Sequence, residues 1–286
     1  MNPAVIGRER QGKACDAVLR MIAQREGAAP TDVKCPDQLR KGGVEIVCRI
    51  GPRLFALEHT LIESYPDQML DSVNFGKIIA PLEKMLEGRL PKTGWFWLTV
   101  EPNSLQAVRN HQIEQVREAI ESWVLERASA LKVGQWIRSD DLTGVSFRIW
   151  LALDSTPLDY CGRLKVARHA PGDAEQLRRQ RINKALSDKL PKLNLWKTEN
   201  NAVSVLVLED TDQSLSNCVV AGEAVKAELA FFPMPPDQIY LVDSKASPWT
   251  VYLLKHGPLV WPLENSRHWD LSRFDEEKLV DLTRCA

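Results

Sequence analysis

Two glutamates interrupt a pair of apolar segments, VEIVCRI (44–50) and RLFALEHT (53–60), that flank Gly51-Pro52. A two-residue hairpin turn there, with a positive φ at Gly51 and the fixed φ of Pro52 after it, sets the register of the two segments. Counting outward then places Glu45 opposite Glu58. Directly opposed like charges destabilise a sheet, and carboxylate oxygens are ligands that Mg²⁺ prefers. The pattern therefore predicts a site for Mg²⁺ or Mn²⁺.

The same register predicts which face of the hairpin is buried. It pairs Ile50 with Arg53, Cys48 with Phe55, Ile46 with Leu57 and Val44 with His59. Because this set is almost continuously apolar, we expect it to face the core, with His59 buried and hydrogen-bonded rather than acting as a general base. The opposite face carries the two glutamates and Thr60.

A purely structural interpretation of the glutamates stays open beside the metal site. Glu45 follows Gly43 and could lie at an exposed strand end. It could also pair with Arg49 or with a lysine from elsewhere in the chain, as surface glutamates commonly do. In either case the two acids would not need a metal ion.

Apolar periodicity predicts alternating helices and strands along the whole chain. Helices are expected at 13–26, 67–89 (with a kink at Pro81), 104–132, 173–190 and 216–230. Strands are expected at 44–50, 53–60, 95–102, 145–153, 163–169, 202–209, 239–243 and 250–254. This alternation indicates an α/β fold with a mixed sheet flanked by helices. The weakest seam lies near 132–144, so we expect a core at 1–132 and an α/β extension at 133–286, with packing of the two as one continuous domain as the alternative.

The segment 13–101 resembles the core of the PD-(D/E)xK nuclease superfamily, whose fold is restriction-endonuclease-like. The resemblance lies in a helix, an acid on one strand, a short hairpin, and an acid followed two residues later by a polar residue. It implies that Glu45 and Glu58 bind the metal, that the His59 carbonyl is a further ligand, and that Thr60 stands at the lysine position. The family also often takes an acid from the first helix, which Glu26 would supply.

Thr60 departs from this pattern, because a hydroxyl cannot supply the cation that offsets charge on a phosphate. Members of the superfamily sometimes carry the lysine on a neighbouring element, and Lys77 is the candidate for such a relocation. Asp243-Ser244-Lys245 spells a rival motif at the end of a strand. Its upstream Pro236-Asp237 is too close to form an opposing strand, so a second site is not expected, although Lys245 could approach the first one.

A basic helix in the second half is the candidate nucleic-acid surface. Arg178, Arg179, Arg181 and Lys184, followed by Lys189 and Lys192, surround an apolar stripe. Such a row of cations could track backbone phosphates. Solvated helix faces carry similar runs, so this interpretation also has a structural alternative.

Composition limits the remaining possibilities. Lysine and arginine number 37 against 38 aspartates and glutamates, which gives no overall attraction to polyanions. The six cysteines are scattered without metal-ligand spacing, which is typical of reduced thiols in the cytoplasm. No apolar run is long enough to span a membrane. No glycine-rich phosphate loop is present, which disfavours ATP or NAD dependence.

These observations lead to one expected function and two alternatives. The first is a metal-dependent nuclease in which Glu45 and Glu58 hold Mg²⁺ or Mn²⁺, the ion activates water, and a phosphodiester bond in DNA or RNA is hydrolysed. The second is a catalytically inactive protein of the same fold that binds nucleic acid or a protein partner. The third is a hydrolase or interaction protein of unrelated α/β fold, in which the glutamates are incidental.

Overall fold

The computed structural model describes residues 3–36, 43–63, 68–139, 142, 145, 147–152, 161–168, 172–211, 217–263 and 270–284. The chain divides into two units. The first unit comprises Met1–Ser64 and Asp173–Ala286, and the second comprises Tyr65–Gly172. The second unit is therefore an insertion between two segments that fold together.

The first unit is built on a mixed sheet, which confirms the expected α/β class. Its strands, in spatial order, are β1 (Pro30–Lys34), β2 (Ile46–Ile50), β3 (Arg53–Leu61), β8 (Val203–Asp210), β9 (Gln238–Asp243), β10 (Trp249–His256) and β11 (Leu259–Val260), with β12 (Leu271–Phe274) also paired to β10. Strands β3, β8 and β9 are parallel to one another. The other pairings in this sheet are antiparallel.

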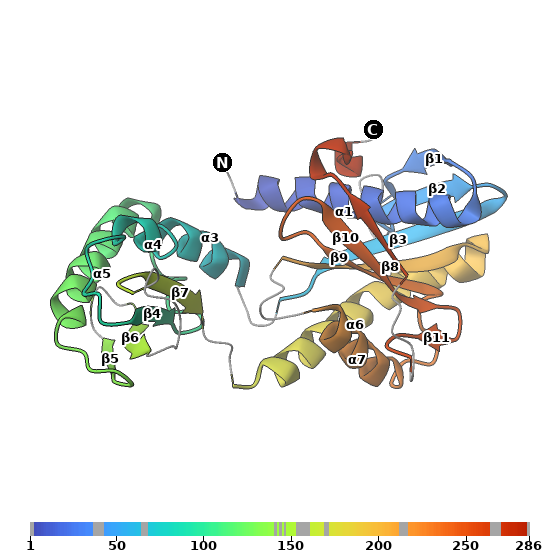
Figure 1. Ribbon diagram of the computed structural model, residues 1–286. Coiled ribbons are helices and arrows are strands. Elements are labelled where there is room, and N and C mark those ends of the chain that lie inside the picture. The colour runs from blue at the N-terminus through green and yellow to red at the C-terminus, as the bar shows by residue number, and fades with distance from the viewer. Residues whose placement is uncertain are drawn as a thin grey trace. The chain divides into compact units, whose positions relative to one another are not determined.

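Helices cover both faces of this sheet (Figure 1). Helix α1 (Pro3–Glu26) packs on one face, where Leu19 and Ile22 meet Phe55 in a buried cluster. Helices α6 (Ala174–Asn200) and α7 (Cys218–Leu229) pack on the other face, where Leu186 meets Leu206. Short 3₁₀ turns at Glu276–Lys278 and Leu282–Arg284 follow β12 near the C-terminus.

The β2–β3 hairpin has the predicted register over its first five pairs. Ile50 pairs with Arg53 next to the turn and Ile46 with Leu57 at the far end, and Gly51 has the expected positive φ of 56°. The prediction is wrong beyond Ile46. Strand β2 begins there, and Val44 belongs to the buried cluster on the α6 side. The reason is that the Glu45 carboxylate accepts the backbone N–H of His59 at 2.7 Å, so the backbone ladder is not extended to this pair.

Helix α6 is longer than the sequence predicts. We expected it to end before Pro191, but it continues to Asn200. Pro191 is exposed and cannot donate to the carbonyl of Ser187, which is also on the exposed side. Buried Leu190 and Leu193 hold the helix on the sheet at this point. The continuation matters because it carries Lys192 on the same helix as Lys189.

The second unit contains a four-stranded sheet in the order β5 (Trp136–Ser139), β6 (Phe147–Ala152), β4 (Trp95–Val100) and β7 (Leu164–Arg168). Its helices are α3 (Gln68–Ile78), α4 (Leu82–Met85) and α5 (Ile113–Ala128), preceded by a 3₁₀ turn at Asn110–Gln112. Phe96 and Leu98 of β4 are buried with residues of these helices. Because β6 pairs with both β4 and β5, the expected seam at 132/133 falls inside this unit.

Two helix predictions in the second unit differ in detail. The helix expected over 67–89 is divided into α3 and α4, with the break next to Pro81 as predicted. The helix expected over 104–132 starts later, because side chains of α3 hold the preceding backbone. Asp71 accepts the N–H of Leu105 at 3.2 Å, and Asn74 donates to the carbonyls of Leu105 and Val108.

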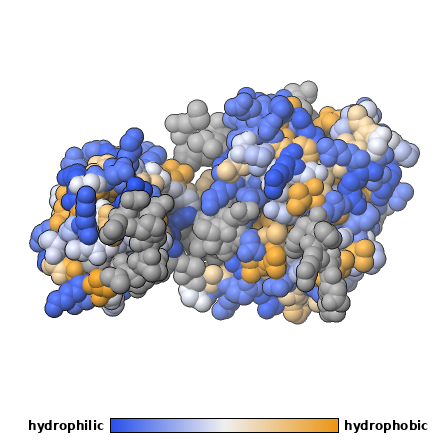
Figure 2. All heavy atoms as spheres, in the orientation of Figure 1, coloured by the Kyte–Doolittle hydropathy of each residue, from blue (hydrophilic) through white to orange (hydrophobic). Residues whose placement is uncertain are grey.

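No helix within the described ranges combines the length and the apolar character needed to cross a bilayer. On the face drawn in Figure 2, hydrophobic residues are scattered among hydrophilic ones in both units.

Candidate functional site

The carboxylates of Glu45 and Glu58 converge on one ammonium group from α6. Lys189 Nζ lies 2.7 Å from Glu45 Oε1 and 2.8 Å from Glu58 Oε2. Glu45 immediately precedes β2, and Glu58 lies on β3. The two acids therefore converge as the sequence predicts, although they are not a paired position of the β2–β3 ladder. The position between them is held by a lysine, which was one of the structural alternatives for Glu45.

Glu58 is the most deeply buried member of this cluster. Its side chain is 0% exposed, and the polar groups that the described residues place against its oxygens are the ammonium groups of Lys189 and Lys192. Burial raises the pKa of the Glu58 carboxyl and the neighbouring Glu45 carboxylate raises it further, although Lys189 and Lys192 act in the opposite direction. Burial and the neighbouring Glu45 carboxylate therefore outweigh the two lysines in their effect on the Glu58 pKa.

The same charges determine the protonation state of Lys189. Burial alone would lower the pKa of its ammonium group, but the Glu45 and Glu58 carboxylates outweigh burial and raise that pKa. Lys189 therefore stays protonated throughout the physiological range. Its side chain is 20% exposed, so the ammonium lies at the margin between the buried acids and solvent.

A second lysine of α6 lies close by. Lys192 follows Lys189 by three residues and so projects from the same side of the helix. Its Nζ is 3.4 Å from Glu58 Oε1, and its side chain is 33% exposed. Thr60, the residue at the lysine position of the nuclease pattern, is half-buried on the Glu58 side of β3, because alternate residues of a strand share a face.

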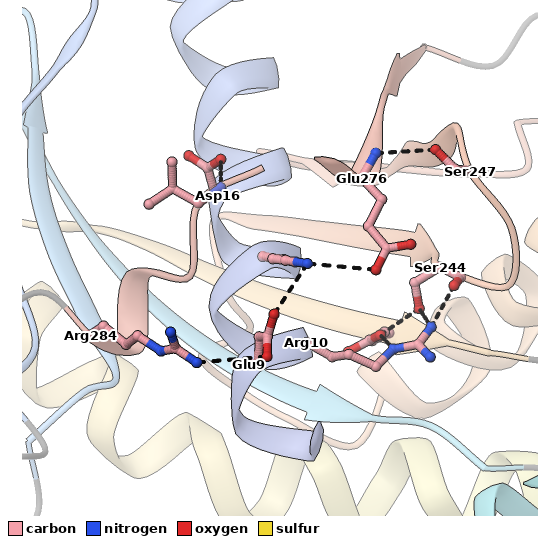
Figure 3. Close-up of polar contacts among 10 residues, drawn as sticks. Glu9, Arg10, Asp16, Ser244, Ser247, Glu276 and Arg284 are labelled. Carbon is pink, nitrogen blue, oxygen red and sulfur yellow. Dashed lines mark hydrogen bonds and ion pairs between the residues drawn. The ribbon is translucent and has the colours of Figure 1, made fainter. Parts of the chain in front are cut away.

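On the opposite face of the sheet, a second polar cluster adjoins His59. His59 is 8% exposed, as predicted for a buried histidine, and its Nε2 lies 2.9 Å from Glu209 Oε2. Ser244 donates its hydroxyl to Glu209, and Arg10 of α1 reaches both residues, as Figure 3 shows for Arg10 and Ser244. Burial would raise the pKa of Glu209, but hydrogen bonding to His59 and these neighbours lowers it.

Of two further residues predicted for the site, one lies elsewhere in the first unit and the other belongs to the second unit. Glu26 is at the C-terminal end of α1, where its carboxylate pairs with Arg53 at 2.8 Å beside the hairpin turn, at the opposite end of β3 from Glu58. Helix α1 therefore brings Arg10, not Glu26, to the end of the sheet that holds His59 and Glu209. Lys77 belongs to the second unit, and its Nζ lies 3.5 Å from Asn110 Oδ1 of that unit.

The proposed nucleic-acid residues of α6 are mostly engaged in ion pairs. Arg178 is 5% exposed and contacts Glu175, so its side chain is not on the surface where nucleic acid would bind. Arg179 pairs with Glu228 at 2.7 Å and Lys184 with Asp188 at 2.7 Å. Arg181 is half-buried. The rival Lys245 is exposed, and its backbone N–H donates to Asp243 Oδ1.

Sequence reasoning placed Lys189 and Lys192 on a phosphate-tracking helix but missed their contact with the acids. A signal was present in the spacing. Lys189 follows buried Leu186 by three residues and precedes buried Leu193 by four, so it lies within the apolar stripe of α6 rather than on its solvated side. A lysine at such a position requires polar partners, for which a carboxylate is one candidate.

The described residues contain no group of three histidine, cysteine, aspartate or glutamate side chains arranged to hold a metal ion. Comparisons with family models, curated proteins and solved structures find no match to this chain.

Proposed function

We propose that this protein is a metal-dependent phosphodiesterase with a restriction-endonuclease-like core, acting on DNA or RNA through Glu45, Glu58 and Lys189. The observation that carries the proposal is the convergence of two carboxylates on one ammonium at the end of a hairpin. The Lys189 nitrogen lies 2.7 Å from a Glu45 oxygen and 2.8 Å from a Glu58 oxygen. Two acids and a lysine are the side chains that the PD-(D/E)xK pattern requires.

The chemistry of the two acids fits a divalent cation. Glu45 and Glu58 offer hard carboxylate oxygens, and cations already lie against both oxygens of buried Glu58, namely the ammonium groups of Lys189 and Lys192. With two protein carboxylates, further ligands would come from backbone carbonyls such as that of His59, from water and from a substrate phosphate. A bound Mg²⁺ or Mn²⁺ would supply Lewis-acid activation of water and of the phosphate.

The lysines of α6 supply the cation that Thr60 lacks. In the nuclease pattern the lysine follows the second acid on the same strand, whereas here Lys189 reaches Glu58 from a helix packed over that strand. An ammonium at this place offsets the negative charge that builds on a phosphate during attack. Hydrolysis would form one P–O bond from water and break the ester P–O bond, and the leaving oxygen would take up a proton.

One observation favours the inactive alternative. Lys189 contacts both acids, so the protein as it stands has a satisfied ion-pair cluster in place of an open metal site. A protein of this fold that had lost its metal could retain the cluster for stability and bind nucleic acid or a protein partner. The two functions differ in whether a divalent cation is used.

The decisive experiment measures cleavage of single-stranded and double-stranded DNA and RNA with Mg²⁺ or Mn²⁺ by wild type and Glu58→Gln. We expect the variant to lose at least about 100-fold in rate, because a neutral amide is a weaker ligand than a carboxylate. Glu45→Gln should behave similarly. Glu114→Gln, which changes an exposed glutamate of α5, is the control expected to keep the wild-type rate. An undiminished rate in folded Glu58→Gln, or no metal-dependent cleavage by wild type, would remove the proposal.

A further inference from the structure

We propose that Lys189 is a displaceable counter-ion, which holds the cation position between Glu45 and Glu58 until a divalent metal ion takes it. Metal binding and release of the Lys189 ammonium are then one coupled event. This inference rests on the proposed function, because it assumes that the two glutamates bind a metal. It adds a regulatory step that the nuclease resemblance does not supply.

The contact distances make simultaneous occupancy unfavourable. Lys189 Nζ lies 2.7 and 2.8 Å from one oxygen of each acid. A Mg²⁺ ion binds carboxylate oxygens at roughly 2.0–2.1 Å, so a metal shared by the same two oxygens would fall in the space that the ammonium holds. Two positive groups in that space would also repel each other strongly in a partly buried setting.

The burial of Glu58 explains why a counter-ion is needed in the absence of metal. With 0% of its side chain exposed, the ionised Glu58 carboxylate depends on the ammonium groups of Lys189 and Lys192 for stabilisation. Glu45 adds a second negative charge beside it. Without metal, an empty position between the two acids would leave like charges together, which a buried site tolerates poorly.

Lys192 provides an internal comparison on the same helix. It contacts one oxygen of Glu58 at 3.4 Å and makes no ion pair with Glu45 among the described contacts. Its more exposed ammonium therefore adds positive charge near the site without filling the shared position. If the effect of Lys189 were only general electrostatics, removal of either lysine would change metal affinity in the same direction and to a similar extent.

Displacement leaves the freed ammonium within the site. The Lys189 side chain is long and 20% exposed, and α6 is anchored by buried Leu186 and Leu190 on either side of it. The backbone therefore stays in place while the side chain changes rotamer. A lysine released in this way remains next to the acids, where it can contact a phosphate.

The test is calorimetric titration of the full-length protein with Mn²⁺ in the absence of nucleic acid. We expect Lys189→Met to bind Mn²⁺ at least about 10-fold more tightly than wild type, because the competing cation is gone. Lys192→Met removes the same charge one turn away and should stay within about threefold of wild type. Lys189→Arg keeps a cation in the position and should bind Mn²⁺ no more tightly than wild type, which tests the idea even if Lys189→Met folds poorly.

The outcomes separate this inference from the proposed function. Unchanged or weaker Mn²⁺ binding by folded Lys189→Met, with wild type still binding Mn²⁺ and cutting nucleic acid, would overturn the placeholder role alone. An equal gain in affinity for Lys192→Met would also overturn it. Absence of Mn²⁺ binding in wild type and both methionine variants would instead overturn the proposed function, and the placeholder role with it.

Discussion

Glu209 of β8 lies 2.9 Å from the ring of His59, the residue that follows Glu58 on β3 and donates its backbone N–H to Glu45. The two faces of one strand are therefore tied to two different polar clusters. Glu58 points to the lysines of α6, and His59 points to Glu209, Arg10 and Ser244. A mutation that disrupts the cluster of His59, Glu209, Arg10 and Ser244 would therefore alter β3 directly beside Glu58.

Glu209→Gln should destabilise the first unit by about 2–3 kcal/mol, because a buried carboxylate that accepts several charged or polar donors would be replaced by a neutral amide. Urea unfolding at neutral pH measures the change. Ser244→Ala removes one donor and should cost about 1 kcal/mol. A Glu209→Gln variant as stable as wild type would show that this cluster does not contribute to folding.

Asp237 should make stability depend on pH in a predictable direction. It pairs with Lys197 at 2.6 Å and accepts the N–H and hydroxyl of Ser204 at 2.9 Å. Burial would raise its pKa, but these partners bring the pKa below its ordinary value of 3.8. A depressed folded-state pKa stabilises the protein above the unfolded-state value, and the contribution is lost as pH falls through the folded-state pKa.

The measurement compares wild type with Asp237→Asn by urea unfolding between neutral and acidic pH. Near pH 7 the variant should be less stable by about 1–2 kcal/mol, since it loses the ion pair and a charged acceptor. The difference should stay constant down to about pH 5 and then shrink below the ordinary pKa. A difference independent of pH throughout would contradict the lowered pKa.

Gly12→Ala should disrupt the packing of the C-terminal segment on α1. A Cβ atom at Gly12 would lie 2.0 Å from Asp281 Oδ1 and 2.7 Å from the backbone nitrogen of Leu282. Because backbone must move to relieve this overlap, we expect a loss of about 2–3 kcal/mol in urea unfolding. Gly76→Ala is the matched control, since nothing lies within 4 Å of its Cβ and alanine favours the helix. Equal stability of Gly12→Ala and wild type would argue against this close approach.

Thr60→Lys tests whether the lysine of the site can be moved back to the strand. Thr60 shares a face of β3 with Glu58, so a lysine there would project toward the same cluster. In a Lys189→Met background, we expect Thr60→Lys to raise the metal-dependent cleavage rate at least about 10-fold above that of Lys189→Met alone, because it returns a cation to the phosphate. Steady-state cleavage assays of the single and double variants measure this. A double variant no faster than Lys189→Met would show that a lysine must come from α6.

Local sequence determined most of the first unit's elements. The turn at Gly51-Pro52 sets the hairpin register, since few residues adopt a positive φ and proline fixes the next one, and all five observed pairs follow. The pattern of apolar residues likewise predicted β8, β9 and α7. The insertion of residues 65–172 was not predictable in this way, because it depends on pairing between strands distant in sequence, such as β3 with β8.

At the candidate site, sequence alone brought Glu45 and Glu58 together but could not say what lies between them. The partner, Lys189, is 131 positions beyond Glu58 in the numbering and reaches it only because α6 packs over β3. Likewise, the spacing along α1 puts Glu26 on the apolar side of that helix. The direction of α1 nevertheless places Glu26 beside Arg53, at the start of β3 and away from Glu58. Short-range geometry follows from backbone constraints within a few residues, whereas the choice of charged partner follows from long-range packing, which only the tertiary structure decides.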